Sequence, residues 1–181
     1  MMYYFLIASL PLLEIGSAAP LTTADFDEML EEALPDSGKR AILSYAGGGG
    51  FPDTCRVYRE MAAFETYLRT RNAQKRAERA GIAFAPADPE TYFSEVDFGL
   101  SQASSCANPL EREFIIDRLR WTHLEELALG HDFDFDALCI YRVKLFIVNK
   151  YNDFRKESGT VNFAAALEKT VGAADKSVKE A

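Results

Sequence analysis

The sequence predicts an all-α protein, a helical bundle with a long antiparallel helix hairpin near its C-terminal end. Apolar residues recur at intervals of three and four along several segments, which is the spacing of one helix face. Residues that cap helices precede these segments, and glycine or proline follows most of them. The chain is 48% hydrophobic and contains 13 Phe and 8 Tyr, which is enough for an aromatic-rich core. We therefore expect a folded chain rather than a disordered one.

The N-terminal segment, residues 3–13, is apolar and rich in aromatic residues, and Pro11 interrupts it. It fits a short strand as well as the start of a helix, so both stay open. Residues 17–19 are small, as at a secretory cleavage site, but no Lys or Arg precedes the apolar run and Pro20 follows the position of the cut. The run is also shorter than the roughly 20 residues that span a membrane. We expect it to belong to the folded protein, with a signal peptide as the alternative.

Two helices are expected before the glycine-rich segment. Thr22 caps the first, and Pro35 stops it. A short second helix covers residues 37–45. Residues 47–52, which include four consecutive glycines, are then expected to form a flexible joint.

A long helix is expected from Asp53 or Thr54 to about residue 80, where Gly81 ends it. Its apolar face holds Val57, Met61, Phe64 and Leu68. A shorter helix is expected to begin at residues 88–90 and to continue through Leu100.

The predicted hairpin consists of the last two long helices. Asn108 and Pro109 begin the first of them, and Gly130 ends it. The second runs from Phe135 to about residue 156 and has a wide apolar stripe. Because a short turn joins the two helices, they should pack antiparallel. We expect one helical domain over residues 1–172, with helix continuing through residues 163–171 and a frayed tail at 173–181.

The acidic run at residues 132–136 suggests a calcium loop, but it does not meet the requirements of one. Such a loop needs Gly at its sixth position and Glu at its twelfth, where this chain has Ala137 and Val143. We expect instead that Asp134 caps the last helix, that Asp136 lies in its first turn, and that the flanking phenylalanines pack beneath them.

Other motifs for chemistry are also incomplete. The glycine run lacks the Lys and Ser or Thr that end a phosphate-binding loop. His123 and Glu126 share a helix face, but di-iron bundles use paired Glu-x-x-His motifs, and this is one reversed copy. Cys55, Cys106 and Cys139 contain no C-x-x-C pair and are expected to be small buried residues. We predict no catalytic, cofactor-binding or metal-binding residues and no enzyme activity.

Charge argues against binding to nucleic acid. The net charge is −8, which opposes contact with a polyanion or an anionic lipid surface. The one basic cluster lies in the second half of the long helix that starts after Thr54, and no aromatic residues that could stack on bases interrupt it. This cluster, which is either a solvated face or a protein contact, contains Arg69, Arg71, Lys75, Arg76 and Arg79.

Several segments resemble a bacterial family in their order along the chain. The start of the chain, residues 3–11, resembles that family's opening, and the acidic helix after it does so too. The family's C-terminal hairpin is matched by residues 119–127, by Gly130-His131-Asp132-Phe133-Asp134 and by residues from 137 to 145. The family is encoded in V-type ATPase operons and resembles a stand-in for the central connector subunit, called C or d.

The resemblance implies a mechanical role without chemistry. The chain would be a non-catalytic connector between the central stalk and the membrane rotor ring, cytoplasmic and peripheral to the inner membrane. Better-known connectors are about twice as long, so this chain would supply a shortened version or help in assembly. The interface is then expected at the basic cluster and at the hairpin turn, with Trp121, His131 and Phe133. The alternatives are a helical adaptor or assembly factor, and a small enzyme or ligand-binding bundle, which a buried polar cluster would favour.

Overall fold

The computed structural model describes residues 2–48, 50–86 and 91–153, and this part of the chain is all-α, as predicted. Within it no helix is both long and apolar enough to cross a membrane. Its helices are α1 (Met2–Ser9), α2 (Thr23–Ala33), α3 (Asp36–Leu43), α4 (Arg56–Ala80), α5 (Ser94–Ser105), α6 (Pro109–Leu127) and α7 (Phe135–Asp153).

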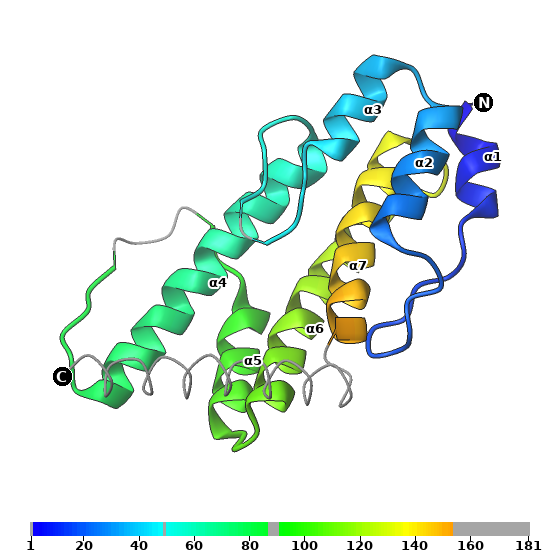
Figure 1. The fold of residues 1–181 in the computed structure, drawn as a ribbon. Helices are drawn as coiled ribbons and strands as arrows, with labels where there is room; N and C mark the ends of the chain where they lie inside the picture. The colour runs from blue at the N-terminus through cyan, green and yellow to red at the C-terminus, as the bar shows by residue number, and fades with distance from the viewer. Residues whose placement is uncertain (1, 49, 87–90, 154–181) are drawn as a thin grey trace, which may run out of the picture.

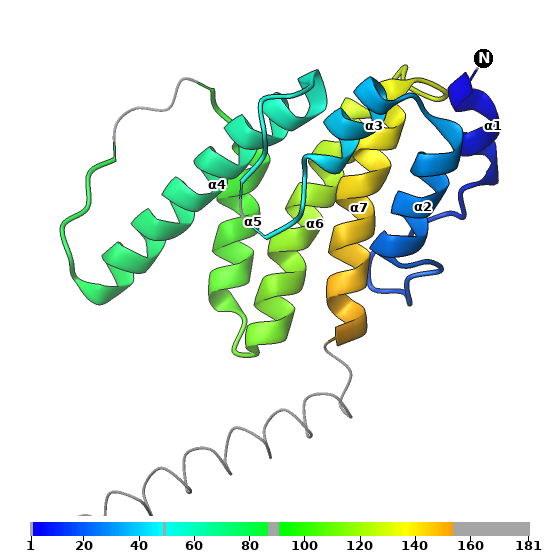
Figure 2. The ribbon, with the colours of Figure 1, turned by 45° about the horizontal axis from the view of Figure 1, so that its top comes forward.

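The helices α5, α6 and α7 lie side by side, and α2 and α1 follow beyond α7 (Figures 1 and 2). The long helix α4 crosses this layer and contacts all three of α5, α6 and α7, and α3 packs on α7. The hairpin is antiparallel, as predicted. Lys150 near the end of α7 pairs with Glu113 near the start of α6, and Lys144 lies 3.7 Å from Glu125 near the end of α6.

Local capping signals set three of the helix starts where they were expected. The Thr22 hydroxyl accepts a hydrogen bond from the Asp25 backbone, and the Asp25 carboxylate accepts one from the Thr22 backbone. Asn108 caps α6 ahead of Pro109. Asp134 accepts a hydrogen bond from the Ala137 N–H at 3.0 Å, which confirms it as the cap of α7.

Two helix starts differ from the prediction. α4 begins after Cys55, whose side chain makes no capping hydrogen bond, so neither Asp53 nor Thr54 is the cap. α5 begins at Ser94, and the preceding Phe93 is extended with φ of −120°. The expected start at 88–90 lies outside the described residues, and the described residues 91–93, which were expected to be helical, are not. The Phe93 ring packs 5.2 Å from the Phe64 ring, so tertiary packing places the start of α5.

The N-terminal segment forms a helix, so the open choice between strand and helix is resolved. Leu6 of α1 and Leu13 after it are buried in the core. The Tyr141 hydroxyl donates a hydrogen bond to the Pro11 carbonyl at 2.9 Å, which ties this segment to α7.

The core lies between α4 and the α5–α7 layer and extends to α2. All four apolar residues expected on the inner face of α4 are buried: Val57, Met61, Phe64 and Leu68. Much of the wide apolar face of α7 is buried as well: Leu138, Ile140, Val143, Leu145, Ile147 and Val148. Two of the cysteines, Cys55 and Cys139, are buried with their sulfur atoms 3.6 Å apart, and Cys106 is partly exposed.

Within the predicted glycine joint, Gly47 and Phe51 pack against the bundle, whereas Gly48 and Gly50 are exposed. Gly47 has φ of +80°, and a Cβ atom there would lie 2.7 Å from the Phe146 ring. The Phe51 ring stacks on Tyr45 with centroids 4.5 Å apart. Gly49 lies outside the described residues, as do the helix expected at 163–171 and the tail expected at 173–181.

Candidate functional site

The basic cluster of α4 does not form one continuous exposed face. Arg71 lies 2.6 Å from the Asp97 carboxylate of α5, and Lys75 donates to Ser101 at 2.8 Å. Arg79 donates to the Ser104 carbonyl at 2.9 Å. These three cations are spaced four residues apart, so they share the side of α4 that faces α5. The hydrogen bonds from these three side chains therefore hold α5 against α4.

The other two cations of this cluster lie elsewhere on α4. Arg76 is exposed. Arg69 pairs with Glu65 at 2.9 Å, beside a cleft between α4, α6 and α7. Of the five basic residues expected at an interface, Arg71 and Lys75 are partly buried, and the other three are exposed: Arg69, Arg76 and Arg79.

The predicted interface residue Trp121 lies in the protein interior. Its side chain contributes little surface, because Trp121 is only 7% exposed. The indole N–H donates to Glu125 at 2.8 Å, and the Lys144 ammonium lies 4.6 Å from the ring. This cation–π contact joins α6 to α7, so Trp121 packs the hairpin together.

His131 lies in a hydrogen-bonded chain at the hairpin turn. Arg56 of α4 donates to His131 Nε2 at 2.9 Å, and it pairs with Asp136 at 2.8 Å. Because a guanidinium can only donate, Nε2 accepts, and Nδ1 carries the proton that it donates to Asp134 at 2.6 Å. His131 thereby fixes the turn to the start of α4, while 29% of its side chain stays exposed.

Phe133 belongs to an exposed aromatic patch that α1 and the hairpin turn build together. We define this aromatic patch as Tyr4, Phe5 and Phe133. Their exposed fractions are 50%, 76% and 50%. The rings of Tyr4 and Phe133 lie 4.7 Å apart, and those of Tyr4 and Phe5 lie 5.7 Å apart. Contiguous exposed aromatic surface is typical of protein-binding sites.

A second feature, missing from the predicted site, is a buried network of charges. Arg120 of α6 donates to both carboxylate oxygens of Glu65 of α4, each at 2.9 Å, and to Asp117 at 2.6 Å. Asp117 also accepts from Lys150 and from the Tyr151 hydroxyl of α7, each at 2.8 Å. Glu65 and Asp117 are 6% and 2% exposed. The network therefore ties three helices together with charge-assisted hydrogen bonds.

The pKa values in this network reflect the competition between burial and pairing. Burial raises the pKa of the Glu65 carboxyl, but hydrogen bonds from Arg120 and Arg69 outweigh it and hold this pKa below its usual value. Burial raises the pKa of the Tyr151 hydroxyl, and its hydrogen bond to Asp117 adds to the rise. Glu65 is thus ionised and Tyr151 protonated at neutral pH.

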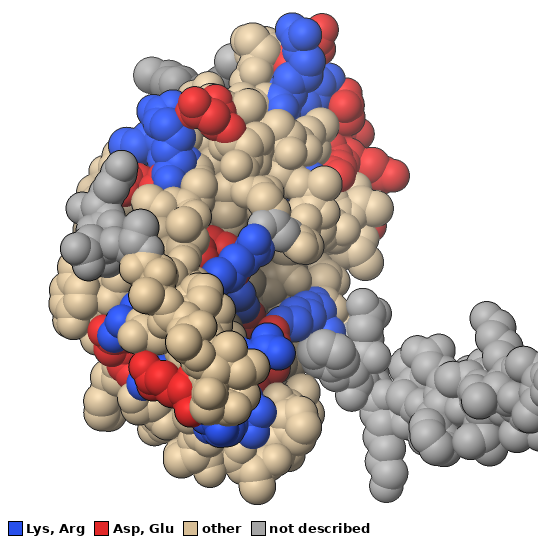
Figure 3. Space-filling view, turned by 90° about the vertical axis from the view of Figure 1, so that its left-hand side faces the viewer, with Lys and Arg blue, Asp and Glu red and all other residues tan. Residues whose placement is uncertain are grey.

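The network borders a cleft of about 550 Å³. The space-filling view shows acidic and basic side chains next to each other around a hollow in this face (Figure 3). The cleft lining carries three acidic groups (Glu65, Glu113, Asp117) and three basic groups (Arg69, Arg120, Lys150). All six pair with one another, so the cluster serves to hold the helices and presents no excess charge to a ligand.

No protein-family model, curated protein or solved structure matches this chain.

Proposed function

We propose that this chain is a non-catalytic, protein-binding subunit of a bacterial V-type ATPase, in the place of the central-stalk connector. The ATPase is suggested by the sequence resemblance. The observation that carries the binding role is the aromatic patch. Its members come from two of the segments that carry the resemblance, residues 3–11 and the hairpin turn.

The buried charges support a mechanical role. Helices that pass torque must not slide past one another under load. Arg120 joins α6 to Glu65 of α4, and Lys150 joins α7 to Asp117 of α6. Each pair is shielded from water and salt on at least one side, so it resists shear better than an exposed pair.

A pull-down with patch variants tests the proposal. The tagged double variant Phe5→Ser, Phe133→Ser should lose the ATPase stalk subunits that the wild-type chain retains from gently solubilised membranes. Phe98→Ser is the matched control. Phe98 of α5 is 75% exposed and Phe5 of α1 is 76% exposed, so Phe98→Ser and Phe5→Ser each remove an equally exposed ring from a helix. Equal recovery of stalk subunits by the double variant and the control would contradict the aromatic patch as the binding surface.

The basic cluster is tested separately through Arg76. Arg76→Glu reverses a charge on the exposed surface of α4, whereas changes at Arg71, Lys75 or Arg79 would also break contacts to α5. Reduced recovery of stalk subunits with unchanged thermal stability would add α4 to the binding surface. Unchanged recovery would restrict the surface to the aromatic patch.

An assembly factor for the same ATPase is the second candidate. The same aromatic patch would serve it, because an assembly factor also binds through exposed apolar surface. The two functions differ in whether the protein stays in the finished complex.

A further inference from the structure

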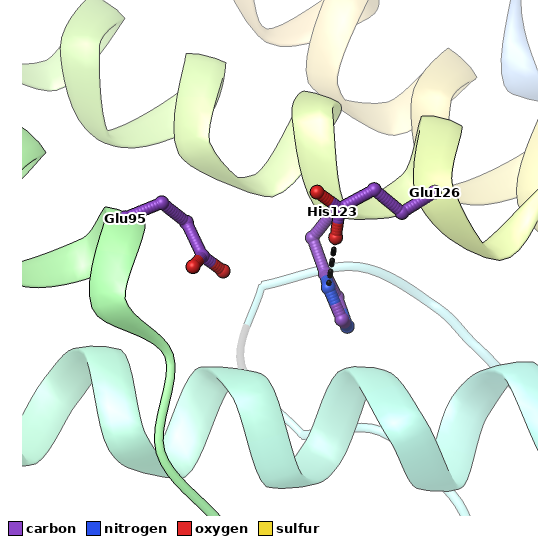
Figure 4. A group of neighbouring side chains, drawn as sticks. All are labelled: Glu95, His123 and Glu126. Carbon is purple, nitrogen blue, oxygen red and sulfur yellow. Dashed lines mark ion pairs between the residues drawn. The ribbon is translucent and has the colours of Figure 1, made fainter.

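A histidine and two glutamates converge between α5 and α6. Glu95 comes from the first turn of α5, and His123 and Glu126 are three residues apart on α6. One potential ligand atom from each lies within 4.8 Å of the other two. Both carboxylates turn toward the imidazole (Figure 4).

The imidazole is buried without a hydrogen-bond partner. His123 is 7% exposed, and neither ring nitrogen has a partner among the described residues. A Glu126 carboxylate oxygen lies 3.6 Å from Nδ1, which is too long for a hydrogen bond. Buried polar groups nearly always have a hydrogen-bond partner. A buried imidazole whose ring nitrogens lack one therefore indicates a ligand that bonds to a ring nitrogen.

Aromatic rings hold the imidazole in one orientation. The Phe64 ring of α4 stacks on it with centroids 4.3 Å apart and planes 8° apart. Phe93 contacts it edge-on at 5.3 Å. The nitrogen that faces the carboxylates is therefore positioned before any ligand arrives, which is the arrangement that favours binding.

The charges around the imidazole suit a cation. The acidic groups that act on it come from three helices: Glu95 of α5, Glu126 of α6 and Glu60 of α4. Metal ions are coordinated by the neutral form of imidazole. A neutral imidazole with the Glu95 and Glu126 carboxylates carries a charge of about −2, which matches a divalent ion.

We propose that Glu95, His123 and Glu126 bind a divalent first-row transition metal ion such as Zn²⁺. An imidazole nitrogen with carboxylate oxygens suits these ions, whereas Ca²⁺ and Mg²⁺ prefer oxygen ligands alone. Ligand atoms around tetrahedral Zn²⁺ lie about 3.4 Å apart, so the carboxylates must move inward by roughly 1 Å. Glu126 can do so by rotating its side chain, 58% of which is exposed.

Such an ion would fasten the first turn of α5 to α6. This inference goes beyond the proposed function and does not depend on it, because it rests on a different face of the hairpin. The sequence predicts no metal site because its motifs for metal binding are incomplete, and it offers only the His123–Glu126 spacing here. Glu95 lies 28 residues before His123 in the sequence, and only the fold brings it to the site.

Calorimetric titration of the full, metal-free chain with Zn²⁺ tests the site. We expect one ion per chain and a higher unfolding temperature in Zn²⁺ than in equimolar Mg²⁺. The variants Glu95→Gln and Glu126→Gln, which change a partly buried and an exposed side chain, should each weaken binding by about tenfold or more. Glu111→Gln removes the same charge from an exposed position of α6 and should leave the affinity unchanged.

The two histidines provide an independent readout. In NMR spectra of the ring nitrogens, Zn²⁺ should shift the His123 signals and leave those of His131 in place. Binding that persists at full strength in both glutamate variants, or that shifts only His131, would overturn the proposal. Absence of any binding at millimolar Zn²⁺ would overturn it as well.

Discussion

Replacing Arg120 with methionine probes the charge network that joins α4, α6 and α7. Arg120 donates to Glu65 and Asp117, which are 6% and 2% exposed, so the change leaves two buried carboxylates with fewer partners. Breaking a buried pair in this way costs about 3–5 kcal/mol. Glu65 keeps its pairing with Arg69, and Asp117 keeps Lys150, so we expect the lower end, about 3 kcal/mol. At this chain length that lowers the unfolding temperature by roughly 6–12 °C.

Urea unfolding, followed by circular dichroism and by Trp121 fluorescence, measures this loss. Trp121 is the only tryptophan, and it lies on α6, one residue from Arg120. Arg118→Met is the control, because Arg118 is exposed on the same helix and should change stability by no more than about 0.5 kcal/mol. A cost below about 1 kcal/mol for Arg120→Met would refute the claim that this network holds the helices together.

Three further predictions follow from particular residues. Folding lowers the pKa of Glu65, so the stability that its ionised carboxylate contributes is complete above the ordinary pKa of 4.5. This stability is lost as the pH falls through the lower pKa of the folded state. When unfolding is measured at decreasing pH, Glu65→Gln should therefore lose less stability than the wild type. In thermal unfolding, Gly47→Ala should destabilise the fold by about 1–3 kcal/mol more than Gly48→Ala. Both glycines have a positive φ, but only at Gly47 does an added Cβ meet the Phe146 ring. Equal losses of stability in the two variants would contradict the packing of this loop. Cys106 should react first with a thiol reagent, and the two buried cysteines only on unfolding; fast reaction of all three would contradict their burial.

Local signals in the sequence were sufficient for most of the helices. Thr22, Asn108 and Asp134 cap helices through contacts within three residues, so the sequence contains the whole signal. Gly81 ends α4 with a positive φ of 68°, as the pattern indicated. The predicted start of α5 was wrong because the packing of Phe93 against distant rings determines where this helix begins. No local residue encodes that contact.

The chemistry of the charged and polar groups depended on contacts between distant parts of the chain. Periodicity placed Glu65 and Arg120 on separate helices but could not pair them, since they lie 55 residues apart in the sequence. Trp121 was expected near an interface because it lies close to the hairpin turn, yet it is buried against Lys144 of α7. Phe133 was expected at the same interface and is half exposed, but its neighbour Tyr4 comes from the other end of the chain.

The most direct measurement of the central claim is the stoichiometry of this chain in the purified V-type ATPase. The complex would be solubilised gently, isolated through a catalytic subunit, and quantified by mass spectrometry against labelled peptide standards. A connector predicts a fixed ratio to the central-stalk subunits and a loss of ATP-driven ion transport when the gene is removed. Recovery in sub-stoichiometric amounts with incomplete stalks would instead indicate an assembly factor. Absence of the chain from both finished and incomplete complexes would contradict the proposed function.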